Sequence, residues 1–211
     1  MEKSKILTQI VLNPKIKIRG DSMVQVYTNA VFNGNHPQIV KSFLDERREE
    51  LIGSAIFTQN NSATSKVVRW AEELKCKEGG FVPSHTGSII EYKNDLYIFD
   101  MKPMRASVQP LLNYLIDTED VYALVLRNFD IDTKMFSLNI AEHIGEFYPF
   151  LSAIRSAFSK WETKWRRHCS EMHLRELQKQ GLFTELNPEI TPDELYHILC
   201  KEKEHVTTSN A

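Results

Sequence analysis

A cysteine and a histidine, well separated in the chain, are the two residues whose types and surroundings suggest chemistry. Cys169 follows the basic segment Arg166-Arg167-His168, and His85 stands near the start of the segment 84–90. A thiol and an imidazole are the minimum parts of a cysteine hydrolase, because the imidazole takes the proton of the thiol and the thiolate attacks a carbonyl carbon. The pair therefore predicts nucleophilic catalysis, provided that the fold brings the two residues together.

Cys169 stands where a helix over 170–180 is predicted to begin, and this position favours a thiolate. Backbone N–H groups and the helix dipole stabilise negative charge at a helix start, and the preceding cations add to the effect. The same N–H groups could supply half of an oxyanion hole. Ser170, Thr86 and Ser84, the neighbours of the two residues, are candidates for contacts with a substrate or an oxyanion. On position alone, however, a single cysteine is more often buried and inert.

Asp100 is the predicted partner that orients the imidazole of His85. The segment 86–100 has the alternation of a β-hairpin. With a loop over 92–95, Gly87 pairs with Asp100. Asp100 then shares a face with His85 and lies on its diagonal, roughly 7–8 Å away between backbones, which is within reach of the side chains.

The same hairpin leaves alternatives to this arrangement open. A tighter turn at 94–95 would move Asp100 out of reach of the imidazole. Glu91 shares the face of His85 but lies at the far end of the strand, about 20 Å away at ~3.3 Å per residue, which makes it the weaker candidate. Asp100 itself could instead be a solvated strand end that pairs with Lys102.

The composition is that of a globular protein and argues against several classes of function. The 211 residues carry 26 Lys and Arg against 28 Asp and Glu, a net charge of -2, which gives no reason to expect nucleic-acid binding. The three cysteines include no CxxC pair, so we predict no structural zinc site and no disulfide framework, and a reducing compartment. We expect no cofactor. A metal site formed by His85, His168 and His173 is the minor alternative.

No stretch of the chain approaches the length and hydrophobicity of a membrane-spanning segment. The apolar stretch 6–12 is interrupted by Thr8 and Gln9, which makes it too short and too polar for a signal-peptide core or a transmembrane helix. We therefore expect a cytoplasmic protein without an integral membrane segment, and export by another route stays open. The basic run 160–167 is expected to be a solvated helix face.

The pattern along the chain predicts an α+β fold, in which a small antiparallel sheet packs against helices. Residues 1–20 have the character of strands, further strands are predicted over 24–27, 51–57, 86–91, 96–100 and 122–127, and helices over 39–50, 65–74, 110–116, 142–165, 170–180 and from 191 onward. The last helix has Thr191 as its N-cap, Pro192 at its first position and Glu194 at its third, which is a capping box.

The same pattern suggests three parts of the chain. Residues 1–49 form an N-terminal extension of strands and one helix, which we expect to pack on the main domain. Residues 50–200 form the domain that carries Cys169, His85 and Asp100. Residues 201–211 form a polar tail.

Five short motifs stand in a fixed order between residues 50 and 200. They are Gly53-Ser54-Ala55-Ile56-Phe57, Ser84-His85-Thr86-Gly87-Ser88-Ile89-Ile90, Leu96-Tyr97-Ile98-Phe99-Asp100, His168-Cys169-Ser170-Glu171-Met172 and Ile190-Thr191-Pro192-Asp193-Glu194-Leu195. In this order they resemble the motifs GDIIF, SHVGIV, YVIEA, CSELV and TPDDL of the circularly permuted branch of the papain-like NlpC/P60 superfamily, in particular the YiiX-like cysteine hydrolases. Each motif alone has low specificity, whereas five motifs in the same order are moderately specific for the family.

The resemblance implies a permuted papain-like fold with a catalytic triad, in which Cys169 is the nucleophile, His85 the base and Asp100 the third member. Permutation accounts for the histidine preceding the cysteine. The implied reaction is hydrolysis of a cell-wall peptide or an acylated small molecule through a thioester. This chain departs from the family in two places, since the shorter Asp100 replaces the usual Glu, and Ser54 replaces the usual Asp and has no assigned role. Residues 1–49 lie outside the resemblance.

Two other functions stay open at this point. A lipid acyltransferase or thioesterase related to the permuted lecithin:retinol acyltransferases would carry an Asn-Cys-Glu-His run, whereas this chain has His168-Cys169-Ser170-Glu171 and no visible membrane anchor. The other is a catalytically silent papain-like module used for binding. The expected partner is a peptide, amide or acyl-ester substrate, and the sequence leaves both its identity and the oligomeric state of the protein open.

Overall fold

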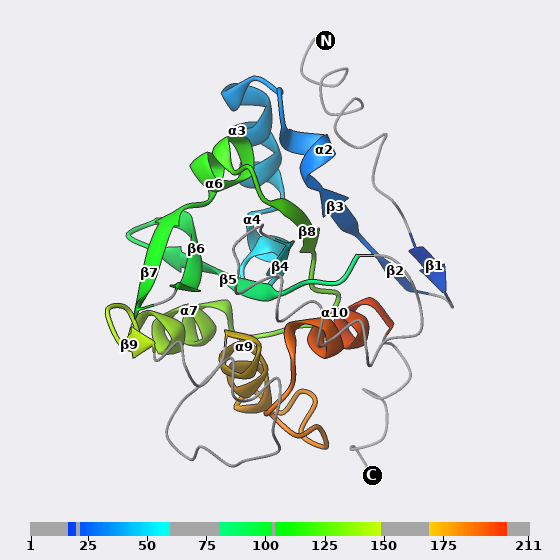
Figure 1. Ribbon diagram of the computed structural model, residues 1–211, viewed down its shortest axis with the longest axis vertical. Coiled ribbons are helices and arrows are strands. Elements are labelled where there is room, and N and C mark those ends of the chain that lie inside the picture. Colours follow the sequence, from blue (N-terminus) through cyan, green and yellow to red (C-terminus); the bar gives the residue numbers. More distant parts are fainter. Residues whose placement is uncertain (1–16, 20–21, 60–80, 103, 149–168, 202–211) are drawn as a thin grey trace.

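The computed structural model describes residues 17–19, 22–59, 81–102, 104–148 and 169–201 (Figure 1). The predicted helix over 65–74, most of the strand-rich leader and most of the polar tail lie outside the described residues, as does the basic segment before Cys169. Strands and helices of the described residues form an α+β structure, which confirms the predicted class. Within these ranges, no helix has both the length and the apolar composition that crossing a membrane requires.

Seven strands form one sheet in which every pair of neighbours is antiparallel. Its order is β3-β8-β4-β5-β6-β7-β9, so β5 is the middle strand. The strands are β3 (Val26–Thr28), β4 (Ala55–Gln59), β5 (His85–Tyr92), β6 (Asp95–Lys102), β7 (Met104–Pro110), β8 (Val121–Val125) and β9 (Phe147–Tyr148). A separate ribbon pairs β1 (Lys17–Arg19) with β2 (Ser22–Val24).

Helices cover both faces of this sheet (Figure 1). One face carries α2 (Asn29–Phe32), α3 (Pro37–Glu46) and α6 (Leu111–Asp117), the other carries α7 (Thr133–Ala141), α9 (Cys169–Gln178) and α10 (Pro192–Lys201), and α4 (Arg48–Leu51) leads into β4. A separate apolar core lies on each face of the sheet, and the neighbouring residues Ile89 and Ile90 belong to different cores. Because successive strand residues point to opposite faces, β5 is apolar on both sides and anchors the helices of both layers.

The described part of the N-terminal extension shares the core of the rest of the chain. β3 is an edge strand of the large sheet and pairs with β8. Phe32, Val40 and Phe43 are buried in the same cluster as Ile56 and Ile89. The described part of the extension therefore contributes β3 and two helices, α2 and α3, to the structure that carries β5.

The β5–β6 hairpin has the register on which the prediction for Asp100 depends. Asp100 stands opposite Gly87, which confirms that register. The turn consists of Lys93 and Asn94, whose φ values of 51° and 62° suit a two-residue hairpin turn that follows the twist of the strands. The turn is shorter than the expected loop over 92–95, because the two end residues of that loop still pair with each other.

The chain between 102 and 148 differs most from the prediction, because β7 and α7 were not expected. The helix predicted over 142–165 is wrong in its described part. Gly145 has a φ of 90° and its N–H donates to the carbonyl of Ala106, while Glu146 accepts from the N–H of Ala106. These bonds turn the chain back onto β7 and lead it into β9 instead of a helix.

Candidate active site

The β5–β6 hairpin brings His85 and Asp100 together. His85 is the first residue of β5, and its Nε2 atom is hydrogen-bonded to Oδ1 of Asp100, which lies opposite Gly87 on β6. The Asp100 side chain is buried, whereas 22% of the His85 side chain stays exposed. The carboxylate can therefore orient an imidazole that solvent still reaches. Glu91, the weaker candidate, instead pairs with Arg48 at 2.7 Å at the other end of β5.

Ile98 and Tyr114 lie near this pair. Ile98 fills the space beside Gly87, where a β-carbon would lie 2.5 Å from Cδ1 of Ile98, so only glycine fits this packing. Burial is the main cause that raises the pKa of the Tyr114 phenol on α6. The charge of the nearby Asp100 carboxylate raises it further. Because the Asp100 side chain is buried, its attraction for a charged His85 is stronger than it would be in solvent.

Cys169 reaches the same corner from α9, of which it is the first residue. α9 packs against β5, and the sulfur of Cys169 is hydrogen-bonded to the imidazole of His85 and to the backbone N–H groups of Thr86 and Ser170. Because Nε2 of His85 is engaged with Asp100, Nδ1 is the ring nitrogen left for the thiol. Thiol, imidazole and carboxylate thus form one chain of hydrogen bonds.

The electrostatics of this corner favour a charged pair. Burial by itself raises the pKa of the Cys169 thiol, but the charge of His85 and the hydrogen bonds to the sulfur together hold that pKa below its ordinary value. Burial by itself lowers the pKa of His85, but the charges of Cys169 and Asp100 raise it well above its ordinary value. Each ion supports the other, so the site favours a thiolate beside an imidazolium more than an isolated thiol and imidazole would.

The three neighbours expected to contact a substrate or an oxyanion differ in what they offer. The buried hydroxyl of Ser170 donates to the carbonyl of Ile190 at 2.6 Å, and the hydroxyl of Ser84 donates to the carbonyl of Thr58 at 3.3 Å. The hydroxyl of Thr86 is buried and has no hydrogen-bond partner in the part of the chain described. Ser170 and Thr86 each contact the sulfur of Cys169 through a backbone N–H group.

His173 lies next to the site, and the sequence alone did not suggest its role. It stands one helical turn after Cys169, fully buried, with its Nδ1 2.8 Å from the hydroxyl of Ser88. The available signal was the spacing, because residues four apart share a helix face. As for the alternative metal site with His85, His168 lies outside the described residues. Within them, no group of three His, Cys, Asp or Glu side chains is arranged to hold a metal ion.

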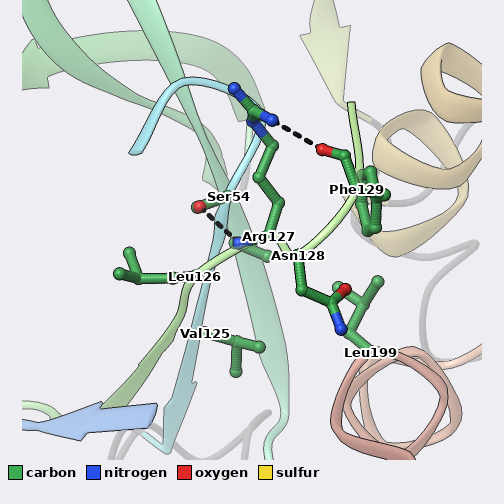
Figure 2. Close-up of a pocket in the computed structure, with 9 residues that line it drawn as sticks. Ser54, Val125, Leu126, Arg127, Asn128, Phe129 and Leu199 are labelled. Atoms are coloured by element: carbon green, nitrogen blue, oxygen red, sulfur yellow. Dashed lines mark hydrogen bonds between the residues drawn. The ribbon is translucent and has the colours of Figure 1, made fainter. Parts of the chain in front are cut away.

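Ser54, which stands where the resembling family has Asp, has a structural role away from this corner (Figure 2). Its hydroxyl donates to the carbonyl of Glu50 at 2.6 Å and accepts from the backbone N–H of Arg127 at 2.9 Å. The guanidinium of the same arginine donates to the carbonyls of Ile52, Phe129 and Glu49. These bonds fix the turn before β4 to the end of β8. These segments line a small pocket at the start of β4. His85 pairs with Thr58 near the other end of that strand.

The sequence matches no family model, and it matches no curated protein. The resemblance to the permuted NlpC/P60 hydrolases therefore rests on the five motifs alone. Three of those motifs meet in the structure, because the segments 84–90, 96–100 and 169–172 form the corner that holds His85, Asp100 and Cys169. The chemistry of the site is accordingly inferred from its own residues.

Proposed function

We propose that this chain is a cysteine hydrolase that cleaves peptide, amide or ester bonds through a thioester acyl-enzyme. The observation that carries the proposal is the position of His85, which has the carboxylate of Asp100 on one ring nitrogen and the thiol of Cys169 on the other. Burial alone would keep a cysteine protonated and inert. A thiol whose pKa is lowered by an adjacent, oriented imidazole is an activated nucleophile.

The first half of the proposed reaction forms the acyl-enzyme. The thiolate of Cys169 attacks the carbonyl carbon of the substrate, so that a carbon–sulfur bond forms and the carbonyl oxygen takes the negative charge. Backbone N–H groups at the start of α9, that of Ser170 among them, stabilise this oxyanion. As the oxyanion collapses, His85 gives its proton to the leaving amine or alcohol, and the carbon–nitrogen or carbon–oxygen bond breaks.

The second half releases the product. Neutral His85 takes a proton from a water molecule while the water oxygen attacks the thioester carbon. Collapse of this second intermediate breaks the carbon–sulfur bond, and Cys169 leaves as a thiolate beside the newly charged imidazolium. Asp100 stays ionised throughout and stabilises the charged state of His85, in the way that the acid of a triad does.

The class we propose is a circularly permuted papain-like hydrolase of the NlpC/P60 type. Its support is the chain order, with a histidine opening one strand, an acid on the next strand and the nucleophile at the start of a later helix. The shorter acid, Asp100, still contacts His85 because the hairpin register places the two residues on a diagonal. A cell-wall peptide or an acylated small molecule is the corresponding substrate class.

Alkylation with iodoacetamide across a range of pH, mapped peptide by peptide, tests the activated thiol. We expect Cys169 to react preferentially below pH 7 and the His85→Ala variant to lose this preference, because an ordinary cysteine forms little thiolate at that pH. Cys200 of α10, a free and partly exposed cysteine, is the internal control. Equal and slow labelling of Cys169 and Cys200 would contradict the proposal.

A nitrophenyl ester separates the hydrolase from the two other functions. A hydrolase releases nitrophenolate with repeated turnover in water, and mass spectrometry of the quenched reaction finds the acyl group on Cys169. An acyltransferase turns over only when an acyl acceptor is added. A silent binding module with a reactive thiol is acylated at most once, and neither water nor an added acyl acceptor gives repeated turnover. The Cys169→Ser variant controls for acylation at other residues.

A further inference from the structure

His173 and Ser88 form a buried polar contact between the helix that carries the nucleophile and the strand that carries the base. The Nδ1 atom of His173 lies 2.8 Å from the hydroxyl oxygen of Ser88, and both side chains are buried. The ring of Phe136 from α7 packs edge-on against the imidazole. Neither His173 nor Ser88 takes part in the proton transfers proposed above.

The His173–Ser88 contact joins α9 and β5 a short distance along both elements from the hydrogen bonds of the site. His173 is one turn beyond Cys169, about 6 Å along α9 at ~1.5 Å per residue. Ser88 is two residues beyond Thr86, about 7 Å along β5 at ~3.3 Å per residue. Two contacts therefore join α9 to β5: the sulfur of Cys169 with the Thr86 N–H, and His173 with Ser88. The spacing between the two contacts is similar along the helix and along the strand.

Two hydrogen-bonded contacts fix the position of α9 along β5 more firmly than one such contact combined with apolar packing. Apolar contacts such as that of Met172 with the core carry little directional preference, so they tolerate a small slide of the helix. A hydrogen bond weakens steeply with misalignment. A slide of about 1 Å along the strand would lengthen the bonds from the sulfur to His85 and Thr86 together, and misplacements of that size have large effects on rate.

The chemical state of His173 suits a fixed tie. Burial lowers its pKa to about 4, so the ring stays neutral at the pH where His85 is charged. No carboxylate within the described residues pairs with its ring, and the groups facing it are the Ser88 hydroxyl and the Phe136 ring. A neutral ring of this kind holds the same hydrogen bond whether Cys169 is a thiol, a thiolate or a thioester.

We propose that Ser88 and His173 are positioning residues, whose contact sets the distance of Cys169 from His85 and from the Thr86 N–H. The inference rests on the proposed function, because it concerns the same nucleophile. It adds a second contact between α9 and β5 to the three residues of the triad. Its loss changes the spacing of the site, and therefore the reactivity of the thiol, while the three reacting side chains remain present.

The Ser88→Ala variant tests the proposal against a matched control, Ser137→Ala. Ser137 of α7 is also buried, and its hydroxyl accepts a hydrogen bond from the backbone N–H of Glu91 at 3.0 Å, at the far end of β5. Each variant removes one hydroxyl between a helix and β5, and each leaves one partner without that hydrogen bond: the buried His173 ring in one case and the part-buried N–H of Glu91 in the other. The loss of stability should therefore be similar, and only the distance of the removed contact from Cys169 differs.

The readout is the pH dependence of iodoacetamide alkylation at Cys169. We expect Ser88→Ala to raise the apparent thiol pKa by about one unit, which slows alkylation at pH 6 about tenfold, while Ser137→Ala leaves the profile unchanged. The same slowing is expected for His173→Leu. His173→Asn, which keeps a polar atom near the place of Nδ1, should restore part of the reactivity.

Two different failures can be told apart in this experiment. If wild-type Cys169 alkylates like Cys200, the proposed function falls and the positioning role falls with it. If wild-type Cys169 is activated but Ser88→Ala and His173→Leu give the wild-type profile, the positioning role alone is overturned. A slowing that is equal in Ser88→Ala and Ser137→Ala would also overturn it, because general loosening of β5 then explains the effect.

Discussion

His85 and His173 both lie against β5 with little solvent around them, yet their pKa values move in opposite directions. Burial lowers the pKa of both rings. At His85 the charges of Cys169 and Asp100 outweigh burial and raise the pKa. At His173 the neighbours are the Ser88 hydroxyl and an aromatic ring, which bring no charge, so burial decides.

The difference shows how one strand supports two kinds of histidine. His85 sits at the end of β5, where a carboxylate from β6 and a thiol from α9 can both reach it. His173 packs against the middle of β5, where neighbouring side chains are apolar or hydroxylic. The charged ring suits proton transfer, and the neutral ring suits a constant hydrogen bond. The partner groups, rather than the depth of burial, assign the two roles.

The His85→Ala variant, which removes the charged ring and leaves the neutral His173, should have the largest effect. We expect a loss of about a thousandfold in ester hydrolysis, since the variant removes both the base and the cation that stabilises the thiolate. Alkylation of Cys169 at pH 6 should fall to the rate of Cys200. A variant that keeps its low-pH reactivity would mean that backbone N–H groups alone lower the thiol pKa.

Asp100→Asn removes one charge and keeps the shape of the side chain. We expect the pKa of His85 to fall and hydrolysis to drop about a hundredfold, because the imidazolium loses its carboxylate partner. Proton NMR of the His85 ring across pH measures the shift. Glu91→Gln, at the far end of β5, is the control and should leave the titration of His85 unchanged. An unaltered His85 titration in Asp100→Asn would show that Cys169 alone sets its charge.

The neutral state of His173 predicts a loss of stability in acid. Its folded pKa is depressed to about 4, whereas the unfolded chain takes up the proton near 6.5. The unfolded state therefore binds more protons between these values, and stability falls as the pH drops through this window. The loss should reach about 2 kcal/mol at pH 4.5. Urea unfolding at pH 7 and pH 4.5 measures it, and His173→Leu should show a smaller difference between the two pH values.

Ser54→Ala gives the smallest expected effect at the site. It leaves the backbone N–H of Arg127 without its acceptor, so the free energy of unfolding should fall by about 1–2 kcal/mol. The alkylation profile of Cys169 should not change, because Ser54 lies at the other end of β4 from the strand pair that holds His85. Urea unfolding and alkylation are measured on the same sample. A changed profile would mean that this turn is coupled to the site.

Local signals in the sequence predicted the hairpin and the last helix. The alternation of 86–100 and its length limit the register to a few choices, one of which places Asp100 beside His85. At the start of α10, Thr191 accepts from the N–H of Glu194 and Glu194 accepts from the N–H of Thr191, so the predicted capping box is confirmed. Both features depend on residues close in sequence, whose geometry the backbone itself restricts.

Other elements could not be predicted because their own sequence contradicts the usual pattern. In α7, Met135 and Leu138 are about half exposed, whereas Ser137 is buried and binds the backbone of β5. Phe136 and Ile140 of the same helix are buried in the core, so its apolar residues lie on both faces and mark no single buried face. β9 replaces a predicted helix because Gly145 bonds to Ala106, a residue of another strand. In both cases a tertiary contact overrides the local preference.

The amino-acid types predict the chemistry of the site, and the hairpin pattern limits the pairing of His85 with Asp100 to a few registers, because only a short turn joins the two strands. The tertiary structure alone decided that Cys169 meets this pair and that His173 is a neutral ring bonded to Ser88, 85 residues away in the chain. Contacts of that span depend on the packing of α9 against β5. Their loop-closure entropy is offset by the burial of the whole core, which no local pattern encodes.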